Sequence, residues 1–162
     1  MSDLETIADR VEIEALRGEF VDALMTHDSD RFASLFAEDG TWRIPYIGVE
    51  LVGREEIRAG IERMQDLWQY FVQTTPHPGT VQLAGDTAIG RAYVSEFGHM
   101  RDGRSELHYA VYHDRYERTR DGWKFASATT RSGTSTRRRL RGRRPAPATP
   151  PNHSSLRGDN SA

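Results

Sequence analysis

The chain has 162 residues, of which 36% are hydrophobic and 28% charged, and its formal net charge is −2, so one domain with an ordinary core is expected. It contains no cysteine, which excludes thiolate metal sites, iron–sulfur clusters, cysteine nucleophiles and disulfide bonds. No apolar run approaches the roughly 20 residues of a membrane span and no basic, then apolar leader opens the chain, so we predict a soluble, cytoplasmic protein without a membrane segment.

Three helices are predicted in the first half of the chain. Apolar residues recur at helical spacing over residues 7–24. Asp28 or Ser29 can cap a second, short helix that continues to Phe36. Acidic residues in the first turn and apolar residues at helical spacing predict a third helix over residues 54–71.

Strands dominate the second half, where the hydrophobic period changes to two. A short strand is predicted at 41–44, ahead of the third helix, and four more at 80–83, 88–100, 106–118 and 123–129. Gly-Asp or Asp-Gly turns separate these four strands. Helices followed by antiparallel strands predict an α+β fold, with three N-terminal helices packed on one face of a curved antiparallel sheet.

The turn at Asp102-Gly103 also predicts which side chains share a face of the sheet. If these two residues form the whole loop, Tyr93 lies opposite Tyr112, and Phe97 lies opposite His108. Because side chains alternate along a strand, one face then carries six residues of these two strands. They are Tyr93, Ser95, Phe97, His108, Ala110 and Tyr112. The pattern alone does not decide which face the helices cover.

The last part of the chain differs in charge and composition from the rest. Residues 1–130 carry 14 basic and 23 acidic side chains, whereas residues 131–162 carry eight arginines and the single acid Asp159. With so few apolar residues, the second part cannot offset its ordering entropy, so we predict a domain at 1–130 and a disordered Arg/Pro-rich tail at 131–162. GC-rich codons read out of frame yield the same composition, which leaves a frame-shifted ending as an alternative.

Short motifs scattered over residues 2–129 carry a resemblance to a known family. They are Ser2-Asp3-Leu4, Arg10, Ile13, Leu16, Arg31, Ala33-Ser34, Trp42, Ile44, Ile47-Gly48, Ala110-Val111-Tyr112, Tyr116-Glu117-Arg118 and Asp121-Gly122-Trp123-Lys124-Phe125. In this order they resemble the SnoaL-like branch of the nuclear transport factor 2-like superfamily, which includes dehydrochlorinases and dehydratases. The resemblance implies a cone-shaped α+β barrel with a deep cavity between the sheet and the helices.

The enzymes of this branch share an Asp–His pair, in which the histidine abstracts a proton and the aspartate orients it. An ungapped comparison places the aspartate at position 25 and the histidine at position 73. This chain has Met25 and Gln73 there, and neither side chain titrates near neutral pH. The proton-abstraction pair of the family is therefore missing at both positions.

Another histidine, His108, is our candidate for the acid–base group. The resemblance places its strand position on the cavity wall, and a histidine in an apolar pocket can act as a base; a structural histidine of the pocket or core is the alternative. The residues predicted to bind the substrate are Phe20, Met25, Trp42, Gln73, Tyr93, Ser95, Phe97, Ala110 and Tyr112. No metal-ligand spacing and no phosphate-binding glycine loop is visible, so no metal or other cofactor is expected.

Two functions of different classes follow from these observations. The first is a cofactor-independent lyase or isomerase that acts on a small apolar molecule. The second is a non-catalytic ligand-binding or dimerisation module that has lost the Asp–His pair. The acidic domain argues against nucleic acid as a partner, and the resemblance implies a homo-oligomer, either a dimer or a trimer.

Overall fold

The computed structural model describes residues 3–136 and, within them, all side chains except those of 75–78 and 132–136. In chain order its elements are α1 (Asp3–Met25), α2 (Ser29–Ser34), β1 (Phe36–Ile44), the 3-10 turn η1 (Pro45–Ile47), β2 (Val49–Val52), α3 (Arg54–Leu67), β3 (Trp68–Ala84), β4 (Thr87–Met100), β5 (Ser105–Thr119) and β6 (Gly122–Thr136). In this described part, no helix combines the length and apolar character needed to cross a membrane.

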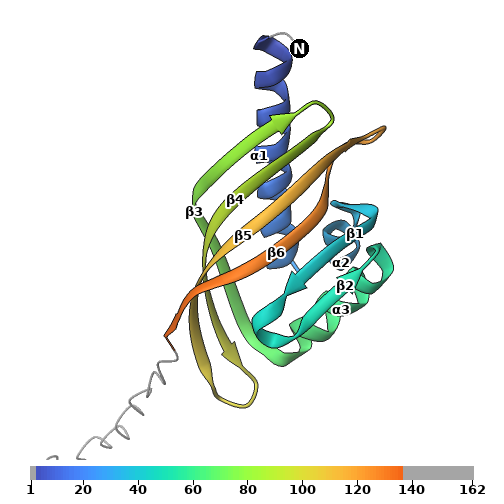
Figure 1. Ribbon diagram of the computed structural model, residues 1–162. Coiled ribbons are helices and arrows are strands. Elements are labelled where there is room, and N and C mark those ends of the chain that lie inside the picture. The colour runs from blue at the N-terminus through green and yellow to red at the C-terminus, as the bar shows by residue number, and fades with distance from the viewer. Residues whose placement is uncertain (1–2, 137–162) are drawn as a thin grey trace, which may run out of the picture.

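The strands of the described chain form one curved sheet of six strands in the order β2-β1-β6-β5-β4-β3. α1 lies along one face of the long strands, and α2 and α3 lie beside β1 and β2 (Figure 1). The predicted α+β cone with three helices on a curved sheet is therefore confirmed. In detail, β1 and β6 pair in parallel while the other neighbours are antiparallel, so the sheet is mixed, and it does not close into a complete barrel.

The core lies between α1 and the concave side of the sheet. The ring of Phe20, from α1, lies 4.7 Å from that of Phe32 and 5.4 Å from that of Phe125, measured between centroids. Trp42 packs edge-on against Phe20 at 6.4 Å. Clusters of this kind join burial of apolar area to favourable ring geometry, so they fix how α1 sits on the sheet.

Two predicted helices end earlier than expected because strands take over their last residues. α2 ends at Ser34, and Phe36 already pairs with Phe125 of β6. α3 ends at Leu67, and β3 begins at Trp68, in a run of aromatic and β-branched residues that suits a strand. Trp68 and Phe71 are three residues apart, which is also the spacing of neighbours on a helix. In the strand, the irregular register after Trp68 lets the two rings meet at 5.5 Å.

The hairpin between β4 and β5 has a register one residue away from the predicted one. Its loop has three residues, because the Met100 amide donates to the carbonyl of Arg104 and the Gly103 amide donates to the carbonyl of Met100. Gly103 is left-handed, with φ +86°, as the third residue of such a loop requires. Tyr93 therefore lies opposite Val111, and His108 lies opposite Glu96 rather than Phe97.

Because side chains alternate along a strand, this shift by one residue turns the predicted β4 residues to the opposite face of the sheet from their predicted partners on β5. Tyr93, Ser95 and Phe97 lie on the face away from the helices, while Ala110 and Tyr112 face the core. The prediction that all these residues share one face with His108 is therefore wrong for Tyr93, Ser95 and Phe97.

The last strand is longer than predicted. β6 pairs with β5 as far as Thr136, which lies opposite Leu107. The predicted boundary between residues 130 and 131 therefore falls inside this strand. The predicted disorder of the remaining tail concerns residues 137–162, which lie outside the described residues.

Candidate active site

A cavity of about 110 Å³ lies between α3, η1 and the inner face of the sheet. This is close to the size of cavities that hold a single six-membered ring, about 150 Å³. Its walls come from every layer of the fold, and most of them are apolar or aromatic. The lining residues are Leu24, His27, Trp42, Ile44, Tyr46, Ile47, Ile61, Met64, Gln65, Trp68, Gln69, Tyr70, Phe71, Gln73, Glu96, Gly98, Glu106, His108, Tyr112 and Thr130.

One wall depends on a glycine. The ring of Trp68 packs against the backbone of Gly98, and a Cβ atom at position 98 would come within 2.2 Å of that ring. Any larger residue would displace the indole. Gly98 therefore sets the position of the aromatic wall.

The polar side of the cavity begins with a buried carboxyl group on β4. The Nε2 atom of Gln73 donates to Oε1 of Glu96 over 2.6 Å, and both residues are at least 90% buried. Burial raises the pKa of Glu96, whereas the Gln73 hydrogen bond and the charge of His108 act in the opposite direction. Burial thus favours the protonated form of this carboxyl group, the form that can donate a proton.

His108 lies across the strand pair from Glu96 and next to a second carboxylate. Its Nε2 atom is 3.0 Å from Oε2 of Glu106, two residues earlier on β5. If Nε2 carries the proton of this bond, Nδ1 is the nitrogen that can accept one. The ring of Tyr46 lies against the imidazole at 5.7 Å and shields it.

Two tyrosines complete this side of the cavity and stay neutral. Burial, together with the nearby carboxylates of Glu96 and Glu106, raises the pKa of Tyr46 to about 12. Burial and Glu96 also raise the pKa of Tyr112 well above its usual value. Neutral phenols can donate hydrogen bonds to a bound molecule but cannot serve as bases near pH 7.

The structure separates the residues that sequence reasoning placed in one site. Trp42, Gln73, His108 and Tyr112 line the cavity. The Met25 sulfur accepts a hydrogen bond from the backbone N–H of Gln73 over 3.3 Å, so positions 25 and 73 are neighbours beside the cavity.

The other predicted binding residues lie elsewhere. Phe20 belongs to the core, where it borders a smaller cavity of about 20 Å³ behind Gln73 and Tyr112. Ala110 is buried on the inner face but does not line the large cavity. Tyr93, Ser95 and Phe97 do not line it either, because the hairpin register turns them to the opposite face.

Two carboxylates, Glu96 and Glu106, were not among the predicted site residues. The missing signal was the loop length, since a three-residue loop places Glu96 beside His108 whereas a two-residue loop places Phe97 there. Among the side chains that the structure describes, no three His, Asp or Glu residues are arranged to hold a metal ion.

The architecture agrees with what comparisons with known proteins show. Gamma-hexachlorocyclohexane dehydrochlorinase from Sphingobium indicum is 32% identical over 136 residues, which cover 78% of this chain and 81% of that protein. The structure of a type 3 hexachlorocyclohexane dehydrochlorinase from Novosphingobium barchaimii superposes with a TM-score of 0.78 at 26% identity, covering 90% of this chain and 99% of the other.

A more distant structure, that of a candidate scytalone dehydratase from Novosphingobium aromaticivorans, shares the fold. Its TM-score is 0.74 at 20% identity, and the match covers 90% of this chain and all of that one. The model of the SnoaL-like domain family matches residues 5–129 of this chain. The chain therefore belongs to the SnoaL-like domain family, within which it has dehydrochlorinase relatives.

Proposed function

We propose that this protein is a cofactor-independent lyase or isomerase that acts on a small, mostly apolar molecule in the cavity. One observation carries the proposal: the buried carboxyl group of Glu96 lies beside His108 on one wall of an otherwise apolar cavity. The names of the dehydrochlorinase relatives support an enzyme rather than a binding module.

In this proposal His108 is the base and Glu106 orients it. The imidazole takes a proton from a carbon atom next to the one that bears the leaving group, and the released electron pair forms a carbon–carbon double bond. The roles match those of the family's missing Asp–His pair, although both residues stand on β5 rather than at positions 25 and 73.

Glu96 is the acid. Its raised pKa keeps the carboxyl group protonated closer to neutral pH, so it can protonate a departing hydroxyl group, which leaves as water. The proton on His108 then returns to Glu96 directly or through solvent, which restores both groups. For an isomerisation the same two groups keep their roles: His108 removes a proton from one carbon atom and Glu96 delivers a proton to another.

The test uses small cyclic β-hydroxy ketones as probe substrates, with the absorbance of the enone product as the readout. Replacing Glu96 by Gln or His108 by Ala should lower kcat by about 10²–10⁴-fold, the usual contribution of one acid–base group. Glu38→Gln, an exposed acid on β1 outside the cavity, is the matched control and should leave kcat unchanged.

Unfolding curves of each variant separate lost chemistry from lost structure. Wild-type rates in a folded H108A variant would remove His108 from the mechanism. Binding of the probe without turnover by the wild-type protein, unchanged in E96Q, would favour the non-catalytic binding module.

A further inference from the structure

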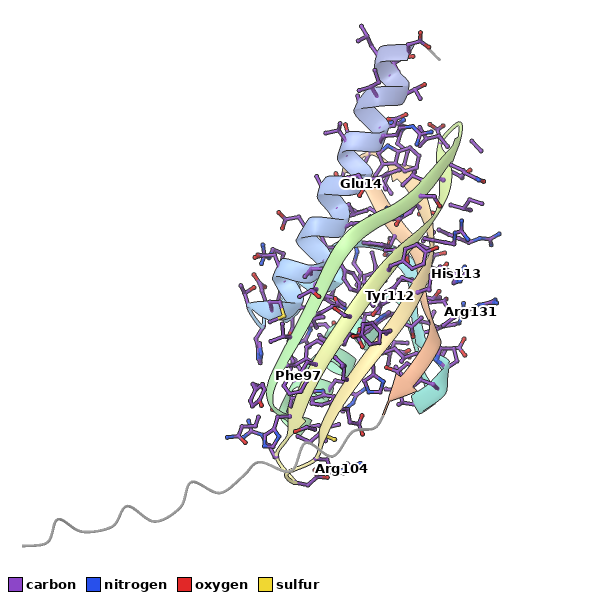
Figure 2. The ribbon with its side chains drawn as sticks, turned by 90° about the vertical axis from the view of Figure 1, so that its left-hand side faces the viewer. Glu14, Phe97, Arg104, Tyr112, His113 and Arg131 are labelled. Atoms are coloured by element: carbon purple, nitrogen blue, oxygen red, sulfur yellow. The ribbon has the colours of Figure 1, made fainter. Side chains whose placement is uncertain are left out.

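The face of the sheet opposite α1 carries a second, open hollow of about 530 Å³. It runs across β3, β4, β5 and β6, and His113 and Arg131 project from this face, away from α1 (Figure 2). Its lining residues are Thr80, Gln82, Ile89, Gly90, Arg91, His113, Asp114, Arg115, Ser127, Thr129 and Arg131. We call this hollow the arginine trough.

Strand register brings the basic side chains of the trough together. Arg91 of β4 lies directly opposite His113 of β5, which in turn lies opposite Thr129 of β6. Arg115 and Arg131 are each two residues along the strand from a member of this row, so they lie diagonally across from it. Such diagonal neighbours are about 7–8 Å apart at Cα, within reach of long side chains.

The guanidinium groups of Arg91, Arg115 and Arg131 have no hydrogen-bond or ion-pair partner in the described part of the chain. Elsewhere in the same structure, Arg31 and Arg118 each pair with two or more carboxylates. Like charges gathered on neighbouring strands repel one another and lower stability. Residues 1–130 carry 23 acids and 14 bases, yet no described carboxylate forms an ion pair with any of these three arginines.

The one acid that lines the trough does not neutralise it. Asp114 is 4% exposed, and its carboxylate accepts a hydrogen bond from the Tyr116 hydroxyl over 2.7 Å on the helix side of the sheet. Burial and the positive charges of Arg131 and Arg91 lower the pKa of His113, as expected for a histidine beside unpaired arginines. The trough thus combines three arginines with the hydroxyl donors of Ser127, Thr129 and Thr80.

We infer that the arginine trough binds a small molecule that carries a phosphate or pyrophosphate group. A planar guanidinium donates two parallel hydrogen bonds to a phosphate, and three of them around a row of hydroxyl groups suit a multiply charged oxyanion. The volume exceeds that of a single phosphate, and Ile89, which is 51% exposed, offers apolar contact for an attached organic group. This site lies on the opposite face from the cavity and does not depend on the reaction proposed there.

The experiment measures the melting temperature of the full chain with inorganic pyrophosphate and with sodium chloride at equal ionic strength, and the affinity for pyrophosphate by calorimetry. Pyrophosphate should raise the melting temperature, because a ligand that binds only the folded state stabilises it. Arg91→Gln and Arg115→Gln should each weaken binding by about tenfold or more, the value of a hydrogen bond to a charged group.

Arg63→Gln is the matched control, because Arg63 is an exposed arginine on α3 without a described partner. It should bind pyrophosphate as the wild type does. Without the anion, R91Q and R115Q should melt no lower than the wild type, since each substitution relieves repulsion. A purely structural role for these arginines would instead lower the melting temperature.

Three results would overturn the inference. One is a pyrophosphate effect no larger than that of sodium chloride, or equally large in R91Q and R115Q. Another is an oligonucleotide that binds through the same arginines while pyrophosphate does not. The third is a salt-sensitive oligomer that dissociates in both variants without any pyrophosphate binding, which would make the trough a contact between copies of the chain.

Discussion

Among single residues, Asp114 is a buried acid that the proposed chemistry does not use. Its carboxylate accepts the Tyr116 hydroxyl, and that hydroxyl accepts a hydrogen bond from Nε of Arg17 over 2.8 Å. Burial raises the pKa of Asp114 to about 7, although these two neighbours act to lower it. In the unfolded chain an aspartate titrates near pH 4.

The stability of the protein should therefore depend on pH through this residue. Between about pH 4 and 7 the folded state holds a proton that the unfolded state has lost, so the free energy of unfolding falls as the pH rises. One proton accounts for at most about 1.4 kcal/mol per pH unit. Asp114→Asn should flatten this slope in urea unfolding curves.

Asp39→Asn, at an exposed position of β1, serves as the control and should keep the wild-type slope. The raised pKa of Glu96 contributes a slope of the same sign, so some pH dependence persists in D114N. A wild-type slope in D114N would contradict the assignment.

A second residue-scale prediction concerns Gly98. A Cβ atom there would lie 2.2 Å from the Trp68 ring, so Gly98→Ala must push the indole out of its place on the cavity wall. We expect a loss of about 1–3 kcal/mol in the free energy of unfolding, as for other overpacked sites, and weaker binding of the probe ketones. Chemical denaturation measures the free energy of unfolding, and calorimetry measures the binding of the ketones.

Gly18→Ala is the comparison variant, because nothing lies within 4 Å of the position where its Cβ would be built on the exposed side of α1. It should raise stability by about 0.5–1 kcal/mol, since alanine favours a helix. Equal effects of the two substitutions would show that Trp68 does not depend on Gly98.

Among the elements, the β4–β5 hairpin decides the composition of the site. Its loop places Glu96 and His108 on the same face, and the turn needs Gly103 in the left-handed region. Gly103→Val should cost at least about 1–2 kcal/mol, because an L-residue with a branched side chain strains this conformation. Gly103→Asn should cost less, since asparagine tolerates it.

Thermal unfolding of both variants checks this difference, and the pyrophosphate and ketone assays show whether the hairpin keeps its register. Similar losses for Val and Asn would mean that the loop does not hold Gly103 in the left-handed region. A variant that stays folded but loses the activity attributed to Glu96 and His108 would point to a changed register instead.

At the scale of the whole molecule, the half of the outer sheet face beside the arginine trough carries exposed apolar side chains. Val72, Tyr93 and Tyr109 are between 42% and 54% exposed there, next to the arginine trough. Contiguous exposed apolar side chains mark interaction surfaces. We predict that copies of the chain associate through this half of the face, which would account for the homo-oligomer expected from the family resemblance.

Tyr109→Glu should therefore convert the protein to a monomer in sedimentation experiments, because a buried unpaired charge is costly in an interface. Val11→Glu, on the exposed side of α1 and 63% exposed, is the control and should keep the oligomeric state. An oligomer that survives in Y109E, or one that is lost in V11E, would place the interface elsewhere.

Much of this architecture could be read from local patterns. Helical spacing located all three helices, and alternation with Gly-Asp or Asp-Gly turns located β4, β5 and the first half of β6, but only residues 80–83 of the 17-residue strand β3. These signals depend on neighbouring residues alone, and they failed where two elements competed for the same residues, as at Trp68 and Phe36. The four-residue edge strand β2 was missed because so short a run carries little periodic signal.

The sequence by itself determined the fold family, the absence of titrating side chains at positions 25 and 73, and the presence of a histidine on the strand that lines the cavity. Only the tertiary structure decided which side chains accompany that histidine. A loop longer by one residue replaces Phe97 with Glu96 opposite His108 and turns Tyr93 to the outer face. Side chains alternate with a period of two, so a single step in register exchanges the two faces of a strand, and no local pattern records that step.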